Sequence, residues 1–319
     1  MKQRYYPGHF FTVIASCLFL QGLSYAQDPI DPVKTSTVGI ARRVLNINSK
    51  VDDYGAYLKR NGLAMYFATN RGSGKTHIYV TKRKALDSGW SEPEYCKVTN
   101  NPQDFVGSIT FDNIGRFYFA TNRETHIGGD INIWQGFGLD SIATIRVLPS
   151  PVNSIKWESQ PTITQDGATM YFVSNRQSPM GSLEMLVDIY VAHQSADGTW
   201  SEPQNLGSSI NIGIHNGTPF ISPDGRFLFY SSKEKKGPDI KRKIYMSEHI
   251  GPKDIDWSKP VRLPSPINSD KDDICPMIAS DGKTIYFSSN REGGSGLDIY
   301  EATLPVDIQN KIFHSFPGY

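Results

Sequence analysis

The chain has 319 residues, and 33 lysines and arginines against 32 aspartates and glutamates give a formal net charge of +1. This balance provides no global field that would attract nucleic acid or an anionic membrane, so no nucleic-acid partner is expected. Apolar residues make up 38% and charged residues 20%, which excludes a disordered chain, and 28 glycines with 20 prolines disfavour a bundle of long helices.

The first 26 residues have the pattern of a secretory signal peptide. Lys2 and Arg4 precede an apolar run over 10–23, and Ser24–Ala26 offers a small-residue cleavage site. The run is shorter than the ~20 apolar residues that cross a bilayer, so we expect no transmembrane span in the mature chain. Lipidation of Cys17 is the less favoured alternative, because the apolar run continues beyond it. The protein is therefore expected to be exported, to the periplasm, the outer membrane or the exterior.

After this segment the sequence repeats five times. Each repeat has a turn of the Asn-Gly or Asp-Gly kind, an apolar and aromatic strand, a Gly-bearing loop and a second strand. Three repeats continue with Trp-Ser-x-Pro, where proline suits an outer edge strand whose N–H has no partner to lose. The first of these apolar strands are predicted over 65–69, 117–121, 170–174, 228–232 and 285–289.

Repeats of about 50 residues with four short antiparallel strands indicate a β-propeller. Residues 44–49 match the exit of an outer strand at 262–269 with two residues deleted, whereas the fifth repeat stops after its third strand. We therefore predict an all-β, five-bladed β-propeller over 44–305. The N-terminal segment supplies the missing outer strand of blade five and closes the ring. Residues 27–43 are then a linker, and 306–319 a C-terminal tail.

The residues also carry a family resemblance. The run Ser222-Pro223-Asp224-Gly225, an aromatic strand, a Gly-bearing loop and Asp-Ile-Tyr together resemble the WD-like repeat of the TolB-type propellers of Gram-negative envelopes. The resemblance covers nearly all of the mature chain. It is specific for the fold, and it implies a propeller of the cell envelope that binds a partner.

Acidic and basic residues recur together on one face of the predicted ring, called the top face here. Four blades present an arginine after the second strand, and the segment that enters each of these blades offers an acid, whereas blade four lacks both. This correlation favours structural ion pairs within each blade over a ligand or metal site, and no metal or cofactor is predicted. The expected pairs are Asp53 with Arg71, Asp104 with Arg123, Glu158 with Arg176, and Asp273 with Arg291.

A carbohydrate-active or glycan-binding propeller is the alternative, with carboxylates near the axis of the top face. Glycoside hydrolysis needs two carboxylates, ~5 to 5.5 Å apart for retention or ~6.5 to 9.5 Å for inversion. Asp104, Glu158 and Asp272 are the candidate catalytic residues for this alternative, and Trp157 beside Glu158 is a candidate platform for a sugar ring.

Blade four carries a local excess of positive charge. A charge run is most often a solvated loop, but an irregular repeat in a uniform ring is also where a binding function is grafted. The candidate binding residues for an acidic partner or an anionic glycan are Lys233, Lys235, Lys236, Lys241 and Arg242.

The sequence thus predicts an exported, non-enzymatic propeller that acts as a monomeric binding or assembly module of the cell envelope. Its partner is expected to be an envelope protein or a glycan that contacts the top face. After removal of the signal peptide, Cys96 and Cys275 remain. They are predicted to lie on different blades, beyond the ~7 Å Cα separation that a disulfide allows, so we expect both to be unpaired.

Overall fold

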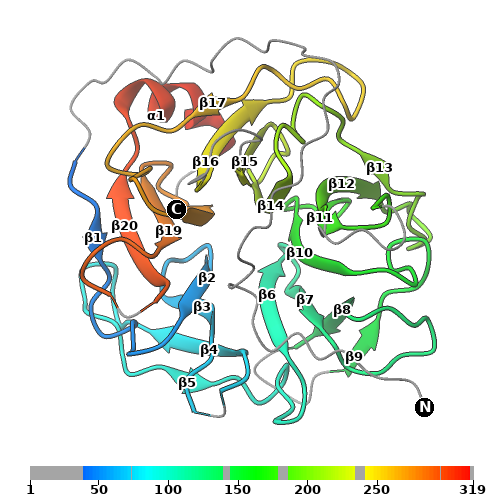
Figure 1. The fold of residues 1–319 in the computed structure, drawn as a ribbon, viewed down its shortest axis with the longest axis horizontal. Coiled ribbons are helices and arrows are strands. Elements are labelled where there is room, and N and C mark those ends of the chain that lie inside the picture. Colours follow the sequence, from blue (N-terminus) through cyan, green and yellow to red (C-terminus); the bar gives the residue numbers. More distant parts are fainter. Residues whose placement is uncertain are drawn as a thin grey trace, which may run out of the picture. The chain divides into compact units, whose positions relative to one another are not determined.

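A computed structural model describes residues 39–72, 74–138, 144–178, 186–233, 241–294 and 296–316. Within these residues, twenty strands form five four-stranded antiparallel sheets arranged in a ring (Figure 1). This confirms the predicted all-β, five-bladed β-propeller. The predicted signal peptide, with Cys17, and most of the predicted linker lie outside the described residues.

Each blade adds its strands in chain order from the axis to the rim. Blade one comprises β2 (Asp53–Leu58), β3 (Ala64–Thr69), β4 (His77–Lys82) and β5 (Glu94–Tyr95). Blade two comprises β6 (Val106–Phe111), β7 (Arg116–Thr121), β8 (Asn132–Phe137) and β9 (Thr144–Val147). Blade three comprises β10 (Glu158–Ile163), β11 (Thr169–Ser174), β12 (Asp188–His193) and β13 (Gln204–Asn205).

The last two blades follow the same order, except that the outer strand of blade five comes from the other end of the chain. Blade four comprises β14 (His215–Ile221), β15 (Phe227–Lys233), β16 (Arg242–Glu248) and β17 (Val261–Arg262). Blade five comprises β18 (Asp273–Ile278), β19 (Thr284–Ser289), β20 (Asp298–Thr303) and the N-terminal β1 (Arg42–Arg43). A helix α1 (Val306–Ile312) and a short 3₁₀ helix η1 (Phe313–Ser315) come last.

The pairing of β1 with β20 closes the ring as predicted. Arg42 lies opposite Glu301 and Arg43 opposite Tyr300. The strand begins before the segment that the sequence singled out, because Val44, rather than Leu45, takes the place of Leu263. Each of these two residues donates its N–H to a strand of its own blade over 3.0 Å, Val44 to Ile299 and Leu263 to Ile244. The alignment therefore has one deleted residue instead of two.

Aromatic side chains in the second strands form the core between blades. One stands at the same register in every second strand, and all five are fully buried. Both faces of a second strand pack on neighbouring blades, and each buried aromatic side chain contributes ~1.5 to 3 kcal/mol. These residues are Phe67, Phe119, Phe172, Tyr230 and Phe287.

The segment predicted as a C-terminal tail packs against blades four and five. Ile308, Ile312 and Phe316 are buried in one cluster with the second and third strands of these blades. The Phe316 ring stacks on Phe220 with 6.3 Å between ring centroids. These contacts make the segment part of the core up to Phe316.

Asparagines in the loops after the outer strands stabilise each blade. In every blade one asparagine accepts the N–H and binds the carbonyl of an isoleucine in the third strand, over 2.6 to 3.1 Å. In blade five this asparagine is Asn48, which lies 251 residues before Ile299. Its homologues are Asn100, Asn153, Asn211 and Asn268.

Replacing Asn48 with alanine should lower the free energy of unfolding by about 2 kcal/mol, because the buried Ile299 N–H loses its partner and the Ile299 C=O keeps only the Val44 N–H. Urea unfolding measures the change. Lys50→Ala, an exposed side chain in the same segment, is the control and should change stability by less than about 0.5 kcal/mol. Equal stability of the two variants would contradict the role of Asn48 in closure.

Candidate functional site

The top face is built by the loops after the second strands and by the segments that enter the first strands. Here each arginine lies within ion-pair distance of an acid of its own blade. The distances are 2.6 Å for Arg71–Asp53, 3.2 Å for Arg123–Asp104, 3.4 Å for Arg176–Glu158 and 2.7 Å for Arg291–Asp273.

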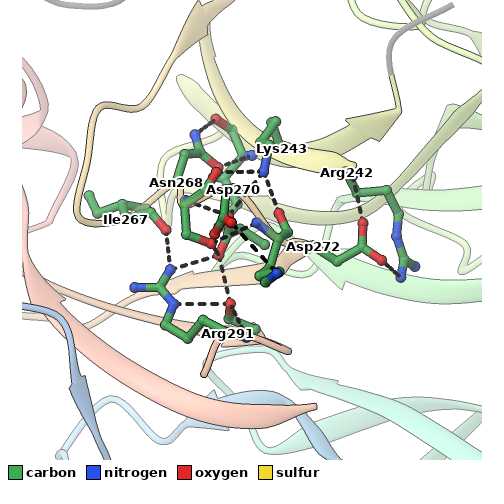
Figure 2. A network of polar contacts seen from close by, with 12 residues as sticks. Arg242, Lys243, Ile267, Asn268, Asp270, Asp272 and Arg291 are labelled. Carbon is green, nitrogen blue, oxygen red and sulfur yellow. Dashed lines mark hydrogen bonds and ion pairs between the residues drawn. The ribbon is translucent and has the colours of Figure 1, made fainter. Parts of the chain in front are cut away.

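Three of these acids are fully buried, and they belong to a repeated hydrogen-bond cluster. Asp273 also accepts from the Ser269 hydroxyl at 3.0 Å and the Ser289 hydroxyl at 2.8 Å. Arg291 donates to the Ile267 carbonyl at 2.7 Å (Figure 2). Its guanidinium lies 5.0 Å from the centre of the Tyr300 ring. Because a buried carboxylate is costly unless it is paired and hydrogen-bonded, these contacts explain why arginine and acid occur together.

Asp104 departs from this pattern. The sequence analysis grouped it with the acids of the other three blades, but the buried position of blade two is occupied by Val106, and Asp104 lies two residues earlier. The entering segment of blade two is one residue longer than in the other blades, counted from Asn100. The Arg123–Asp104 pair is consequently more exposed, with 22% and 17% of the two side chains accessible.

Blade four replaces the repeated pair with a contact to blade five. Asn216 occupies the position of the acid, where it accepts from the Ser232 hydroxyl at 2.7 Å. Lys243 reaches into the neighbouring loop, donating to the Ser269 carbonyl at 2.7 Å and lying 3.4 Å from Asp273 (Figure 2). Burial lowers the pKa of Lys243, and the attraction of Asp273 opposes this effect.

The candidate binding residues of blade four are only partly available to a partner. The Arg242 guanidinium lies 2.9 Å from Asp272, and the Arg242 N–H donates to the same carboxylate at 2.7 Å (Figure 2). Lys233 and Lys241 are half-buried. The other two candidates, Lys235 and Lys236, lie outside the described residues.

The candidate sugar site near Trp157 does not present its groups to solvent. Trp157 is only 6% exposed, and Glu158 is fully buried. Both carboxylate oxygens of Glu158 are hydrogen-bonded, to the Ser154 N–H at 2.9 Å and to the Ser154 and Ser174 hydroxyls at 2.7 and 2.8 Å. In this arrangement Glu158 is a structural acceptor.

An axial cavity of about 60 Å³ lies between the inner strands of all five blades, where the sequence predicted no site. In each inner strand the residue two positions after the acid position lines it, and all five of these residues have a left-handed backbone at a bulge in the strand. A water needs roughly 10 to 15 Å³ of such volume, so the cavity accommodates several water molecules. The five residues are Gly55, Ser108, Gln160, Thr218 and Cys275.

Hydrogen bonds link this ring on one side of the axis. The Thr218 N–H donates to the Gln160 side-chain oxygen at 2.6 Å, and the Cys275 N–H donates to the Thr218 hydroxyl at 3.0 Å. Burial raises the pKa of the Cys275 thiol to about 11, so this cysteine is protonated and a poor nucleophile at neutral pH. Cys275 and Cys96 are both free thiols.

The described part of the chain bears on two features, metal sites and membrane-spanning helices. No group of three or more histidine, cysteine, aspartate or glutamate side chains in these ranges is arranged to hold a metal ion. No helix among the same residues has the length and apolar character needed to cross a membrane.

No protein-family model and no curated protein sequence matches the chain. Solved structures match at the level of fold. A thermostable family-43 glycoside hydrolase has a TM-score of 0.52 and 14% identity, with 82% of this chain and 91% of the hydrolase covered. The endo-arabinase from Bacteroides thetaiotaomicron has a TM-score of 0.51 and 17% identity, with coverages of 85% and 98%.

TolB-type propellers are also among the structural neighbours. TolB from Acinetobacter baumannii has a TM-score of 0.46 and 14% identity, and 82% of this chain is covered. The chain spans 56% of the length of that TolB. At these identities the likeness is one of fold, and it is shared by TolB-type propellers and glycoside hydrolases.

The axial ring gives a matched pair of substitutions. Ser108 has φ of 50°, and its hydroxyl forms no hydrogen bond with the described residues, so Ser108→Gly should raise the free energy of unfolding by about 0.5 to 1 kcal/mol. The reverse substitution, Gly55→Ser, is at a position where a Cβ would have nothing within 4 Å. It should lower the free energy of unfolding by about 1 kcal/mol, because residue 55 has a left-handed backbone. Thermal and urea unfolding measure both, and the same sign for the two variants would refute a backbone cause.

The Arg242–Asp272 pair predicts a pH dependence. Burial opposes ionisation of Asp272, but the Coulombic attraction and hydrogen bonds of Arg242 outweigh it and hold the pKa of Asp272 below its ordinary value. The stabilisation is therefore fully present above the unfolded-state pKa of about 3.9 and is lost as the pH falls through the folded-state pKa.

Asp272→Asn should accordingly destabilise the protein by about 1 kcal/mol at pH 7, and the difference from wild type should shrink as the pH falls below 4. Urea unfolding at several pH values provides the measurement. Asp270→Asn is the control, because the Asp270 side chain is 82% exposed. A deficit that stays constant down to the acid transition would argue against this ion pair.

Proposed function

We propose that the protein is an exported, non-enzymatic β-propeller that acts as a binding or assembly module of the cell envelope, with the top face as its contact surface. One observation carries this proposal. Of the three carboxylates that a hydrolase on this face would use, Glu158 is fully buried and saturated with hydrogen bonds, and Asp272 is held by Arg242. Asp104 is held by Arg123.

Rigidity of the top face also supports a binding role. The repeated clusters of arginine, acid and serine fix the loops that form the face, so a partner meets a surface that is already ordered. Preorganisation reduces the entropy lost on association. The half-buried Lys233 and Lys241 are not ion-paired within the described residues, and they give the face a positive site for an acidic protein segment or an anionic glycan.

A carbohydrate-active propeller is the second candidate. It is favoured by the accessibility of Asp104 and Asp272, whose side chains are 17% and 21% exposed at the top face. The likeness to family-43 hydrolases adds the fold alone. For this candidate, binding of a sugar would have to displace Arg123 or Arg242 from its carboxylate before either acid could transfer a proton.

Two assays on the purified protein separate the candidates. A glycan array with a reducing-sugar assay tests hydrolysis, and affinity capture from envelope extracts tests protein binding. We expect no turnover. Turnover that Asp104→Asn or Asp272→Asn abolishes would overturn the non-enzymatic proposal.

The binding arm uses charge reversal on opposite faces. Lys233→Glu combined with Lys241→Glu should weaken capture of the retained partner at least tenfold. Lys283→Glu, in the turn between β18 and β19 on the opposite face, should leave capture unchanged. Equal loss in both variants would assign the effect to net charge instead of to the top face.

A further inference from the structure

The outer strands form the rim of the ring, and their free edges can be compared blade by blade (Figure 1). In each blade one residue just after the outer strand donates its N–H inward to the third strand over 3.0 or 3.1 Å. Backbone groups alternate in direction along an antiparallel strand, so the residue three positions earlier has its N–H on the outward side. The inward donors are Val44, Cys96, Leu148, Leu206 and Leu263.

Three blades place proline at this outward position, namely Pro93, Pro203 and Pro260. Proline has no N–H to offer, and it is a common way to block a sheet edge against further pairing. Blade two has Ile145 at the same register, and blade five has Ala41. The edge of blade two therefore lacks the protection that three other blades share.

Blade two also has the longest outer strand. β9 has four residues, whereas each of the other outer strands described has two. By the alternation given above, Ile145 and Val147 direct their backbone N–H and C=O groups away from β8. Within the described ranges these groups have no backbone partner, because β9 is the last strand of its sheet. The edge offers two donors and two acceptors in strand geometry.

The side chains along this edge alternate in character. Thr144 and Arg146 are exposed on one face of the sheet, and Phe137, opposite Thr144, is 58% exposed. Ile145 and Val147 are half-buried on the other face. Arg146 has no ion pair with the described residues, unlike the arginines of the top face.

The charge of Arg146 decides between two kinds of occupant. In a symmetric pairing of two copies, the register that uses both Ile145 and Val147 places Arg146 opposite Arg146 of the second copy. Like charges directly opposite each other destabilise a strand pair. A carboxylate at that position would instead form a cross-strand ion pair, so the edge suits a different, acidic strand.

We propose that the outer edge of β9 binds an extended peptide segment of a partner protein as a fifth strand of blade two. Main-chain hydrogen bonds to Ile145 and Val147 hold the segment, which is the mode of β-strand addition. An acidic side chain lies opposite Arg146, and β-branched side chains lie beside Ile145 and Val147. This surface is on the rim and not on the top face, so it goes beyond the function proposed above and is tested separately.

The probe is a fluorescein-labelled peptide with the sequence Ser-Val-Glu-Val-Thr-Gly, compared with the same peptide carrying lysine instead of glutamate. Fluorescence polarisation with the purified protein should show at least tenfold tighter binding of the glutamate peptide. Arg146→Glu should reverse this preference. Ile145→Pro should weaken binding at least tenfold, whereas Ile145→Val, which keeps the N–H, should bind as wild type.

Folding of the proline variant is checked by circular dichroism, and proline already stands at this register in three blades. A glutamate peptide that is N-methylated at its two valines provides a second test that leaves the protein unchanged, and it should bind at least tenfold more weakly. Equal affinity for the glutamate and lysine peptides would overturn the proposal. Dimerisation of the wild type that Ile145→Pro abolishes would also overturn it, because the edge would then belong to a second copy.

Discussion

Closure of the ring by β1 is the constraint on which the other features depend. Five blades bury their second strands on both faces only if blade five meets blade one, and the outer strand that completes blade five comes from the opposite end of the sequence. Asn48 then secures Ile299 across 251 residues, as its homologues do within their own blades. Closing this long loop costs chain entropy once, and the closed ring then fixes the geometry of the hydrogen-bond clusters in every blade.

The charged groups of the top face are understandable as part of this architecture. An acid buried at the start of a first strand needs both hydrogen bonds and a counter-charge, and removing one partner of such a pair is far more destabilising than losing an exposed pair. Blade four has an amide, Asn216, at this position, so it requires no arginine. Its own cation, Lys243, serves the acid of blade five instead. The exception thus follows the same electrostatic rule as the repeat.

The strands and the blade number were predictable from sequence because the hydrophobic pattern and the turns repeat at a nearly constant spacing. Other features depend on contacts that no local pattern reveals. The asparagines resemble ordinary loop residues until the third strand is placed beside them, and one extra residue after Asn100 moves Asp104 out of register. In sequence Trp157 is a candidate platform for a sugar ring, yet it is buried. The five residues with a left-handed backbone around the axial cavity have only one weak signal in the sequence, a proline that follows Gln160, Thr218 and Cys275.

A propeller has two sets of free strand edges, and this chain treats them differently. The inner edges face one another around a narrow cavity, where bulges and three prolines leave little room for another strand. The outer edges face solvent, where proline protects three blades. Positions that repeat in every blade are explained by stability, so a position at which one blade breaks the pattern without a compensating contact needs another explanation. Lys243 compensates for the exception in blade four. Blade five also lacks the proline, with Ala41 at that register, but its outer strand β1 has only two residues. Among the described residues nothing compensates for Ile145 in the four-residue β9, and this difference is what makes the rim of blade two a candidate for recognition.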